Sequence, residues 1–494
     1  MAHRNMFKFL FIFLPVVAIS GSRIHITLER AVDIAMQNSY RVKRLKLDIE
    51  RNTYWLRARQ AGLKSKVYMN LRTPDLQNIS DYRWNSITYR DEIVHLNTQM
   101  WESVLSVRQP VVLFGYPTNG YVSLNYQVYR YLQKENHSSE VDYYNRLYMR
   151  YVQPFFLPNE LKNDLEEAQL NLKDVQLDYV EERVEIIEDI SDDYYDAFEL
   201  DYTRTIYQRQ MALLKKIHDV TERSSQTGDN RKALIQVQLE MANVRENILE
   251  TQSQLRMALA DMKQRLRLNP DDSLYITPEI QLDPISVDLD EAIHYGFTLN
   301  PRLQRMQISR RKAEIDLENV KGWDAFHMEL EMTYGLEKND QELHTIWNQY
   351  DNSNSITLNA YLPIWDWGAR KYRIEAERRD LQRRELDMEE RQDDLKKDIV
   401  TARTNLKEYL ERCLNMQESL KLADEFSEIS IQEYEKGEIS LNDLLQIVTR
   451  NQETESKLLE SYLGYKRSIV ELMVSTYYDF ENGESLLDAL SGNG

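Results

Sequence analysis

Histidine and carboxylate side chains on one face of a short segment are the residues of this chain that could bind a metal ion. His327, Glu329 and Glu331 alternate along an extended stretch, so their side chains point to the same side. None of the 8 histidines belongs to a His-Glu-x-x-His pair, and the glycine patterns that bind nucleotide phosphates are absent. We therefore predict no catalytic residues, no metal and no cofactor, and interpret these three residues as part of a polar strand face.

The composition excludes several classes of protein. The 494 residues include 62 Lys and Arg against 81 Asp and Glu, a net charge of −19, whereas a nucleic-acid partner would require a basic surface. Mean hydropathy is −0.62, and no internal stretch has the roughly 18 uncharged apolar residues of a membrane-spanning helix. A single cysteine excludes a disulfide scaffold. With 14 glycines and 11 prolines, the chain has too few turn residues for an all-β or doubly wound α/β protein of this length.

The first 22 residues read as a secretory signal peptide. Basic residues precede a short apolar run, residues 9–19, which is followed by the small residues Ser20, Gly21 and Ser22. A buried N-terminal helix is the alternative interpretation. A signal peptide over residues 1–22 would place the mature protein outside the cytoplasm.

Two long tracts without proline, residues 159–269 and 364–494, mark the helical parts of the chain, because proline is poorly tolerated inside a helix. Within the second tract, apolar residues recur every seven positions, a spacing typical of a coiled coil. Cys413 lies on this seam and is interpreted as a small core residue. The seam consists of Ile374, Leu381, Met388, Leu395, Ala402, Tyr409, Met416 and Ala423, with Ile399, Leu406, Cys413 and Leu420 interleaved.

Other segments alternate with a period of two residues. Residues 327–336 and 355–362 each place apolar side chains on one face and mostly polar side chains on the other. Such strands fit a half-buried sheet, or a barrel with lipid outside and water inside. Periodicity does not separate these two structures, but the secretory signal favours the barrel.

An internal repeat organises the chain. Ala31 in Thr-Leu-Glu-Arg-Ala matches Ala292 in Asp-Leu-Asp-Glu-Ala at an offset of 261, whereas Pro154 matches Pro363 at an offset of 209. The difference, 261 minus 209, leaves 52 extra residues in the first half. A duplication of this length predicts two similar halves. Each half reads as helix, strand, strand, long helix, turn and helix.

The predicted boundaries follow from this repeat. The first repeat spans residues 23–268, a proline-containing linker spans 269–287, the second repeat spans 288–480, and 481–494 form a C-terminal tail. Each repeat should begin with one helix, over 27–65 and over 289–325. The extra residues, within roughly 73–145, form either an external hairpin, which we favour, or an added pair of barrel strands.

Three motifs give the chain a family resemblance over residues 25–480. These are Gln153-Pro-Phe-Phe, the block Leu362-Pro-Ile-Trp-Asp-Trp-Gly-Ala-Arg370, and Tyr434-Glu-Lys-Gly-Glu-Ile-Ser-Leu-Asn-Asp-Leu-Leu445. Together with the order of elements, they resemble the TolC-type outer-membrane efflux family. The resemblance implies a mainly α fold with a small β-barrel part. In that fold, long coiled-coil hairpins form a trimeric periplasmic tunnel below a shared 12-stranded transmembrane barrel, four strands from each chain.

The resemblance also implies a function. The chain would be a homotrimeric, passive exit duct in the outer membrane of a Gram-negative bacterium, with a large periplasmic part and contacts with outer-membrane lipid. Its partners would be a periplasmic adaptor, the membrane fusion protein, and an inner-membrane transporter of RND, MFS or ABC type, in efflux or type I secretion. Aromatic residues would mark the strand-to-helix junctions, unless they are ordinary packing: Pro154, Pro363, Trp365 and Trp367.

The resemblance assigns the periplasmic end as well. Gly228 and Gly437 match the tip glycines where the adaptor docks, and Tyr434 and Asp443 match a latch tyrosine and a gate aspartate. Three positions depart from the family pattern. The second gate position holds Gln446, and two latch positions hold Ile439 and Leu234. A ring of three Asp443 carboxylates would bind cations and repel anions. The alternative is that Asp443 is a solvated residue near a helix start.

One other class fits the heptads. A secreted or periplasmic coiled-coil structural or adaptor protein would keep the seam, but it would not need strands with an apolar face. Extraction as a trimer from outer membranes only with detergent would separate the two.

Overall fold

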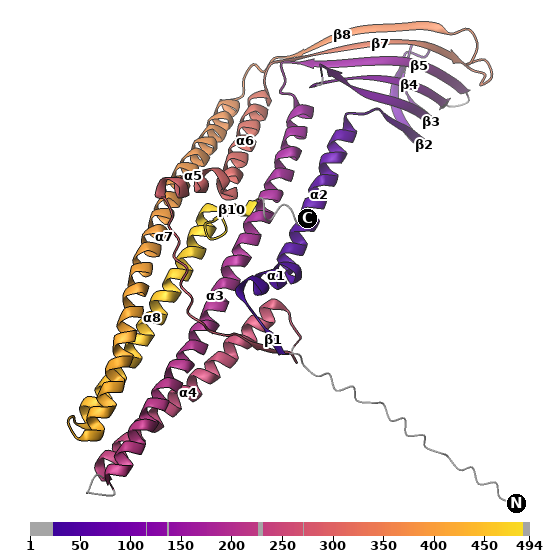
Figure 1. Ribbon diagram of the computed structural model, residues 1–494. Coiled ribbons are helices and arrows are strands. Elements are labelled where there is room, and N and C mark those ends of the chain that lie inside the picture. Colours follow the sequence, from indigo (N-terminus) through magenta and orange to yellow (C-terminus); the bar gives the residue numbers. More distant parts are fainter. Residues whose placement is uncertain (1–22, 115, 136–137, 226–230, 270, 488–494) are drawn as a thin grey trace, which may run out of the picture. The chain divides into compact units, whose positions relative to one another are not determined.

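The structure is a computed structural model that describes residues 23–114, 116–135, 138–225, 231–269 and 271–487 (Figure 1). The expected signal peptide and Gly228 lie outside these residues. The described chain forms two compact units. One, here called the helical unit, contains residues 23–44, 179–301 and 392–487; the other, the sheet unit, contains residues 45–178 and 302–391.

Eight helices occur in the described residues, in four pairs of similar length. The members of a pair have 11 and 11, 23 and 22, 66 and 68, or 36 and 36 residues. The pairs are α1 (Leu28–Asn38) and α5 (Leu289–Leu299), α2 (Tyr40–Gly62) and α6 (Pro301–Gly322), α3 (Glu160–Ser225) and α7 (Ala369–Lys436), and α4 (Arg231–Leu266) and α8 (Leu441–Thr476).

The single helices expected over 27–65 and 289–325 are wrong, because each is broken once. The first break is at Ser39, whose hydroxyl accepts hydrogen bonds from the backbone N–H groups of Arg41 and Val42, at 3.2 and 3.3 Å. This is the capping arrangement that starts a new helix. The second break is at Asn300, because the following Pro301 disfavours a helical backbone there.

The heptad seam packs into the core of the helical unit, as predicted. Leu395, Ile399, Ala402 and Leu406 of α7 are buried. Cys413 packs with aromatic and aliphatic residues of α3 and α8, and burial raises the pKa of its thiol. The cluster around it includes Tyr195, Phe198, Tyr202, Ile206, Leu458, Leu459, Tyr462 and Leu463.

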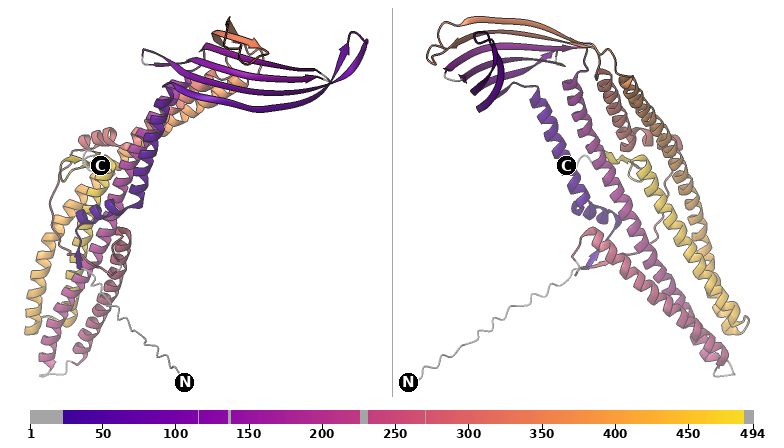
Figure 2. Two further views of the ribbon diagram at one scale, coloured as in Figure 1. Left: turned by 90° about the vertical axis from the view of Figure 1, so that its right-hand side faces the viewer. Right: turned by 180° about the vertical axis from the view of Figure 1, so that it is seen from behind.

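Six long strands form one antiparallel sheet, two more than the four strands per chain expected from the resemblance. Their order is β2-β3-β4-β5-β7-β8 (Figure 2). Two short pairs also occur, β1 (Arg23–His25) with β6 (Ser273–Tyr275), and β9 (Tyr478–Asp479) with β10 (Glu484–Ser485). The described helices contain no apolar stretch long enough to cross a membrane. The long strands are β2 (Lys66–Asn85), β3 (Arg90–Leu113), β4 (Tyr116–Glu135), β5 (Ser138–Phe155), β7 (His327–Asp340) and β8 (Asp351–Tyr361).

The extra residues of the first half supply β3 and β4, which lie between β2 and β5 in the sheet. A separate external hairpin, the interpretation favoured from the sequence, is therefore wrong. The turn between β3 and β4 is held against the start of α3. Asn119 donates a hydrogen bond to the carbonyl of Pro158 at 2.6 Å and accepts one from the Leu161 N–H at 3.3 Å. Asn159 donates a bond to the Pro117 carbonyl in return.

Candidate functional site

Rows of paired residues across the sheet alternate between polar and apolar. The row through Lys66 is polar, and the next row, through Val67, is apolar except at its last position. Successive side chains along a strand point to opposite faces, so the sheet has one polar and one apolar face. The first row is Lys66, Arg108, Ser123, Arg150, Thr333 and Ser355, and the second is Val67, Val107, Leu124, Met149, Tyr334 and Asn354.

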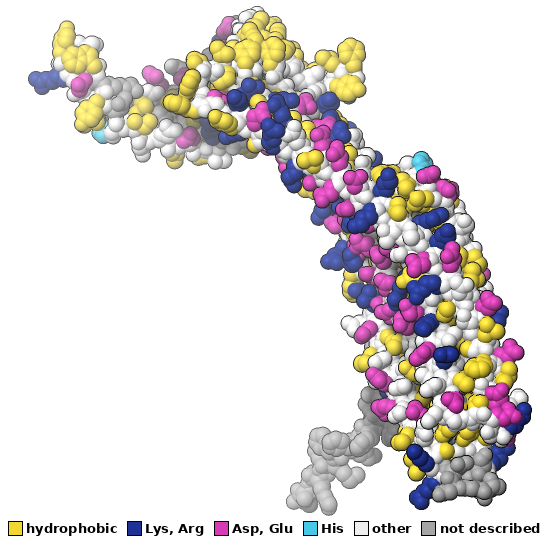
Figure 3. Space-filling view, turned by 90° about the vertical axis from the view of Figure 1, so that its left-hand side faces the viewer, with side chains coloured by type: hydrophobic (Ala, Val, Ile, Leu, Met, Phe, Trp, Pro, Cys, Tyr) yellow, Lys and Arg dark blue, Asp and Glu magenta, His cyan; other side chains and the backbone are white. Residues whose placement is uncertain are grey.

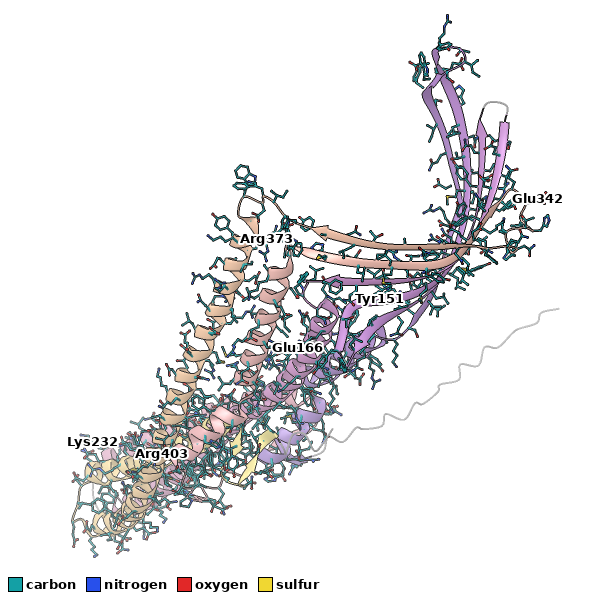
Figure 4. The ribbon with its side chains drawn as sticks, turned by 90° about the horizontal axis from the view of Figure 1, so that it is seen from above. Tyr151, Glu166, Lys232, Glu342, Arg373 and Arg403 are labelled. Carbon is teal, nitrogen blue, oxygen red and sulfur yellow. The ribbon has the colours of Figure 1, made fainter. Side chains whose placement is uncertain are left out.

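The apolar face is uncovered over much of its area. Leu71 on β2 is 66% exposed, and Ile356 on β8 is 74% exposed. Tyr151, labelled in Figure 4, lies on this face of β5 in the same row as Met332 and Ile356. Hydrophobic side chains gather over the strands in Figure 3, whereas charged side chains cover the helices. An exposed apolar surface spread over six strands marks a face that contacts lipid or another protein.

The polar face carries ion pairs between neighbouring strands. Arg150 on β5 is 2.7 Å from Glu331 on β7, and Arg146 is 3.4 Å from Glu337. Arg72 on β2 is 3.5 Å from Glu102 on β3. Sequence reasoning did not identify these pairs. The spacing of Arg146 and Arg150 by four residues, which keeps both on one face, is the signal that could have found them.

His327 and Glu331, two of the three residues that could bind a metal, make other contacts in the structure. The His327 ring stacks on Tyr361 with 5.0 Å between centroids, and Glu331 is paired with Arg150. One group of possible ligands does occur among the described residues. His218, Asp219 and Glu222 on α3 have donor atoms within 4.8 Å of one another. His218 lies 3.7 Å from Asp219 and 3.4 Å from the side-chain amide of Gln238, so these side chains already have partners within the protein.

The junction between β8 and α7 is built by Asp366. Its carboxylate accepts hydrogen bonds from the N–H groups of Gly368 and Arg370, at 2.8 and 2.9 Å, which caps the start of α7. These two bonds lower the pKa of the carboxyl. Trp365 and Trp367 flank it, 74% and 84% exposed, with ring centroids 5.4 Å apart. Pro363 precedes them, so the predicted aromatic residues do lie at the strand-to-helix transition.

The corresponding junction of the first half lies between β5 and α3. Pro154 pairs with Glu329 of β7 at the end of β5. Phe156 follows with a positive φ of 68°, and its ring lies 5.6 Å from that of Phe326. Glu166 of α3, labelled in Figure 4, then pairs with Arg311 of α6 at 2.6 Å. The Arg311 guanidinium lowers the pKa of this carboxyl.

The turn between α7 and α8 is made by Gly437. Its φ of +81° is in the left-handed region, and a β-carbon there would meet no atom within 4 Å. The conformation, and not crowding, is therefore the reason for glycine at this position. Just before it, the Tyr434 hydroxyl lies 3.1 Å from the Thr221 hydroxyl of α3.

Two further polar contacts join the helical hairpins near this turn. Arg223 of α3 is 3.3 Å from Glu435 of α7. Gln236 of α4 donates a hydrogen bond to Asn442 of α8 at 2.8 Å. Together with Tyr434 and Thr221, these pairs are here called the hairpin latch. The sequence pointed to Tyr434 alone, because its partners come from a helix about 200 residues away.

Asp443 occupies the third position of α8 in a capping box. Its N–H donates to the Ser440 hydroxyl at 3.2 Å, and its carboxylate accepts from the Ser440 N–H and hydroxyl at 3.4 and 2.7 Å. The carboxylate has a structural role in starting the helix. It is also exposed, as is Gln446 one turn later, so both remain available to solvent.

A buried carboxylate lies deeper among the helices. Glu455 of α8 is only 4% exposed in its side chain and pairs with Arg209 of α3, which is 58% exposed. The Tyr202 hydroxyl is 3.5 Å from the same oxygen. Burial raises the pKa of Glu455, and Arg209 opposes this shift. The sequence did not distinguish Glu455 from the 81 acidic residues of the chain.

Comparison with known proteins agrees with this architecture. The family model of outer membrane efflux proteins matches residues 299–475. This part of the chain is similar to outer membrane efflux proteins. No curated protein matches the sequence.

Solved outer-membrane channels share the fold over nearly the whole chain. The CmeC channel of Campylobacter jejuni superposes with a TM-score of 0.64 at 14% identity, covering 99% of this chain and 97% of that one. VceC of Vibrio cholerae gives 0.64 at 12%, covering 91% and 95%. CusC, described in terms of transmembrane channel formation, gives 0.64 at 11%, covering 92% and 93%. The resemblance to TolC-type efflux proteins seen in the sequence motifs is thereby confirmed.

Proposed function

We propose that the chain is one subunit of a homotrimeric outer-membrane channel that passes molecules from the periplasm to the outside. The observation that carries this proposal is the two-faced sheet. Its apolar face suits lipid, and its ion-paired polar face suits a water-filled lumen. The family match of residues 299–475 supports export as the direction of transport.

The partners of this duct would lie in the periplasm and the inner membrane. A periplasmic adaptor would dock at the turns that contain Gly228 and Gly437, and an inner-membrane transporter of RND, MFS or ABC type would supply the energy. The duct itself would be passive, in either efflux or type I secretion.

The α7–α8 turn would carry the gate. Three Asp443 carboxylates from three subunits would make a negative ring, with Gln446 one turn further along each α8. The hairpin latch would hold α3 and α4 against α7 and α8 in each subunit. Breaking contacts such as that between Tyr434 and Thr221 would let the hairpins separate when the adaptor docks.

Extraction and electrophysiology test the channel itself. The full chain should leave outer membranes only with detergent, as a trimer, and should conduct ions in a planar bilayer. A secreted coiled-coil protein would instead appear in the aqueous fraction without conductance, and that result would overturn the proposal.

A pair of substitutions separates the charge of Asp443 from its capping role. Asp443→Asn removes the charge but keeps an oxygen that can accept the Ser440 hydrogen bonds, whereas Ser440→Ala weakens the cap and keeps the charge. We expect Asp443→Asn to lower cation selectivity in bilayers and Ser440→Ala to leave it unchanged. Equal selectivity in both variants and the unmodified protein would remove Asp443 from the gate.

A further inference from the structure

The two outer edges of the sheet lack partners. Among the residues that the structure describes, β2 and β8 each have a strand on one side only. β2 has 20 residues and β8 has 11, so both edges present rows of unpaired backbone groups. Unprotected edges of this length normally pair with another strand.

The directions of these two strands suit a second copy of the chain. All five pairings from β2 to β8 are antiparallel, and six alternating strands leave β2 and β8 running in opposite directions. β8 of one copy beside β2 of the next therefore continues the antiparallel order.

The stagger of the sheet also suits closure. Lys66, the first residue of β2, shares its row with Ser355, six residues before Tyr361 at the end of β8. Those six residues measure about 20 Å, and the five interstrand steps measure about 24 Å. The start of β2 and the end of β8, which both connect to helices, lie at the same height only if the strands tilt by about 40° from the barrel axis. This angle is within the range of roughly 35–45° found in membrane barrels.

β3 and β4 are positioned to be part of the same closed sheet as the other four long strands. The turn between β3 and β4 is bonded to the start of α3 through Asn119 and Asn159. The end of β3 and the start of β4 therefore lie at the same level as the helix-linked ends of the other strands. Their side chains also follow the two faces of the sheet. Leu105 and Leu124 lie on the apolar face, and Ser106 and Ser123 on the polar face.

We propose that three copies of the chain close β8 onto β2 of the next copy to form an 18-stranded barrel. This inference rests on the proposed trimeric channel and deepens it. At about 4.8 Å per strand and about 40° of tilt, 18 strands give a backbone diameter of about 36 Å, against about 24 Å for 12 strands. The wider lumen would be lined by the cross-strand pairs such as Arg150 with Glu331.

The faces limit the register between copies. Ala360 and Leu358 lie on the apolar face of β8, and Val67, Met69 and Leu71 lie on the apolar face of β2. Apolar faces align only if Ala360 lies opposite an odd-numbered residue of β2. If the end of β8 and the start of β2 are at the same height, the residue of β2 opposite Ala360 is either Val67 or Met69.

Disulfide cross-linking tests the closure. In a Cys413→Ala background, we would pair Ala360→Cys with Val67→Cys or with Met69→Cys, and use Tyr68→Cys as a control on the opposite face. Oxidation should give covalent dimers and trimers with one apolar-face pair and none with the control. A chain that forms no trimer and no cross-link would overturn the proposed channel together with this inference.

The number of strands is tested separately by electron cryomicroscopy of the trimer in lipid nanodiscs, with 18 strands expected. Spin labels give a second readout. Labels at Leu105→Cys and Leu124→Cys should be accessible to oxygen from the acyl chains. Labels at Arg108→Cys and Gln127→Cys, which lie on the polar face at less buried positions, should be accessible to a water-soluble relaxation agent. A trimer with 12 wall strands, or water contact at all four positions, would overturn the 18-stranded barrel and leave the channel function standing.

Discussion

Replacing Arg209 by alanine should destabilise the helical unit by about 2–3 kcal/mol at pH 8. The substitution leaves the Glu455 carboxylate, 4% exposed, without its cationic partner. Breaking a buried ion pair costs about 3–5 kcal/mol. The cost here belongs below that range because the Arg209 side chain is 58% exposed, so water already screens the pair.

The loss should depend on pH in a defined direction. Burial raises the pKa of Glu455, and removing Arg209 removes an interaction that lowers it. The folded state of the variant then takes up a proton more readily than the unfolded state does. Its stability therefore rises as pH falls through the folded-state pKa, and the difference from the unmodified protein should be smaller at pH 5 than at pH 8.

Urea unfolding of the detergent-solubilised protein, followed by circular dichroism at both pH values, measures this effect. Lys407→Ala is the matched control, because it breaks an exposed pair with Glu411 at 3.9 Å within α7 in the same helical unit. That change should cost less than about 0.5 kcal/mol. Equal losses at pH 5 and pH 8, or a loss no larger than that of the control, would refute the assigned role of Glu455.

Three other substitutions test separate parts of the structure. Gly437→Ala should destabilise the turn by about 1 kcal/mol because the backbone φ of Gly437 is positive. Faster hydrogen exchange at the turn would show this loss. Gly62→Ala is the control, because a β-carbon there meets no other atom, and it should leave hydrogen exchange unchanged. Gly335→Ala would bring a β-carbon within 2.5 Å of the Tyr148 β-carbon, so it should abolish the folded-barrel band on semi-native gels; an unchanged band would contradict that packing. Arg311 lowers the pKa of Glu166, so this pair stabilises the fold above the usual glutamate pKa and loses its effect as pH falls below about 4.5. Arg311→Ala should flatten that part of the pH–stability curve.

Local patterns in the sequence were sufficient to predict whether most segments form a helix or a strand. The absence of proline and the seven-residue spacing predicted α7 with its buried seam, including Cys413, because helix periodicity needs no information beyond the helix itself. Single-residue signals were weaker. Ser39 and Pro301 each start a new helix, but the expected helices were drawn through both positions.

Some residues of the candidate site could likewise be recognised from the sequence, and others could not. Gly437 and the Trp365 and Trp367 junction were recognised from local motifs, and the structure places them at a helical turn and a helix start. Thr221, the partner of Tyr434, was not recognised, because it comes from another long helix.

The sequence alone determined that this protein combines long helices with two-faced strands, since both patterns repeat within a few residues. Only the tertiary structure decided that β3 and β4 lie between β2 and β5, which changes the sheet from four strands to six. The same alternating residues satisfy an external hairpin or a wall strand. The choice depends on backbone pairing with distant strands and on the Asn119 and Asn159 contacts at the start of α3. Those interactions form only when the chain is folded.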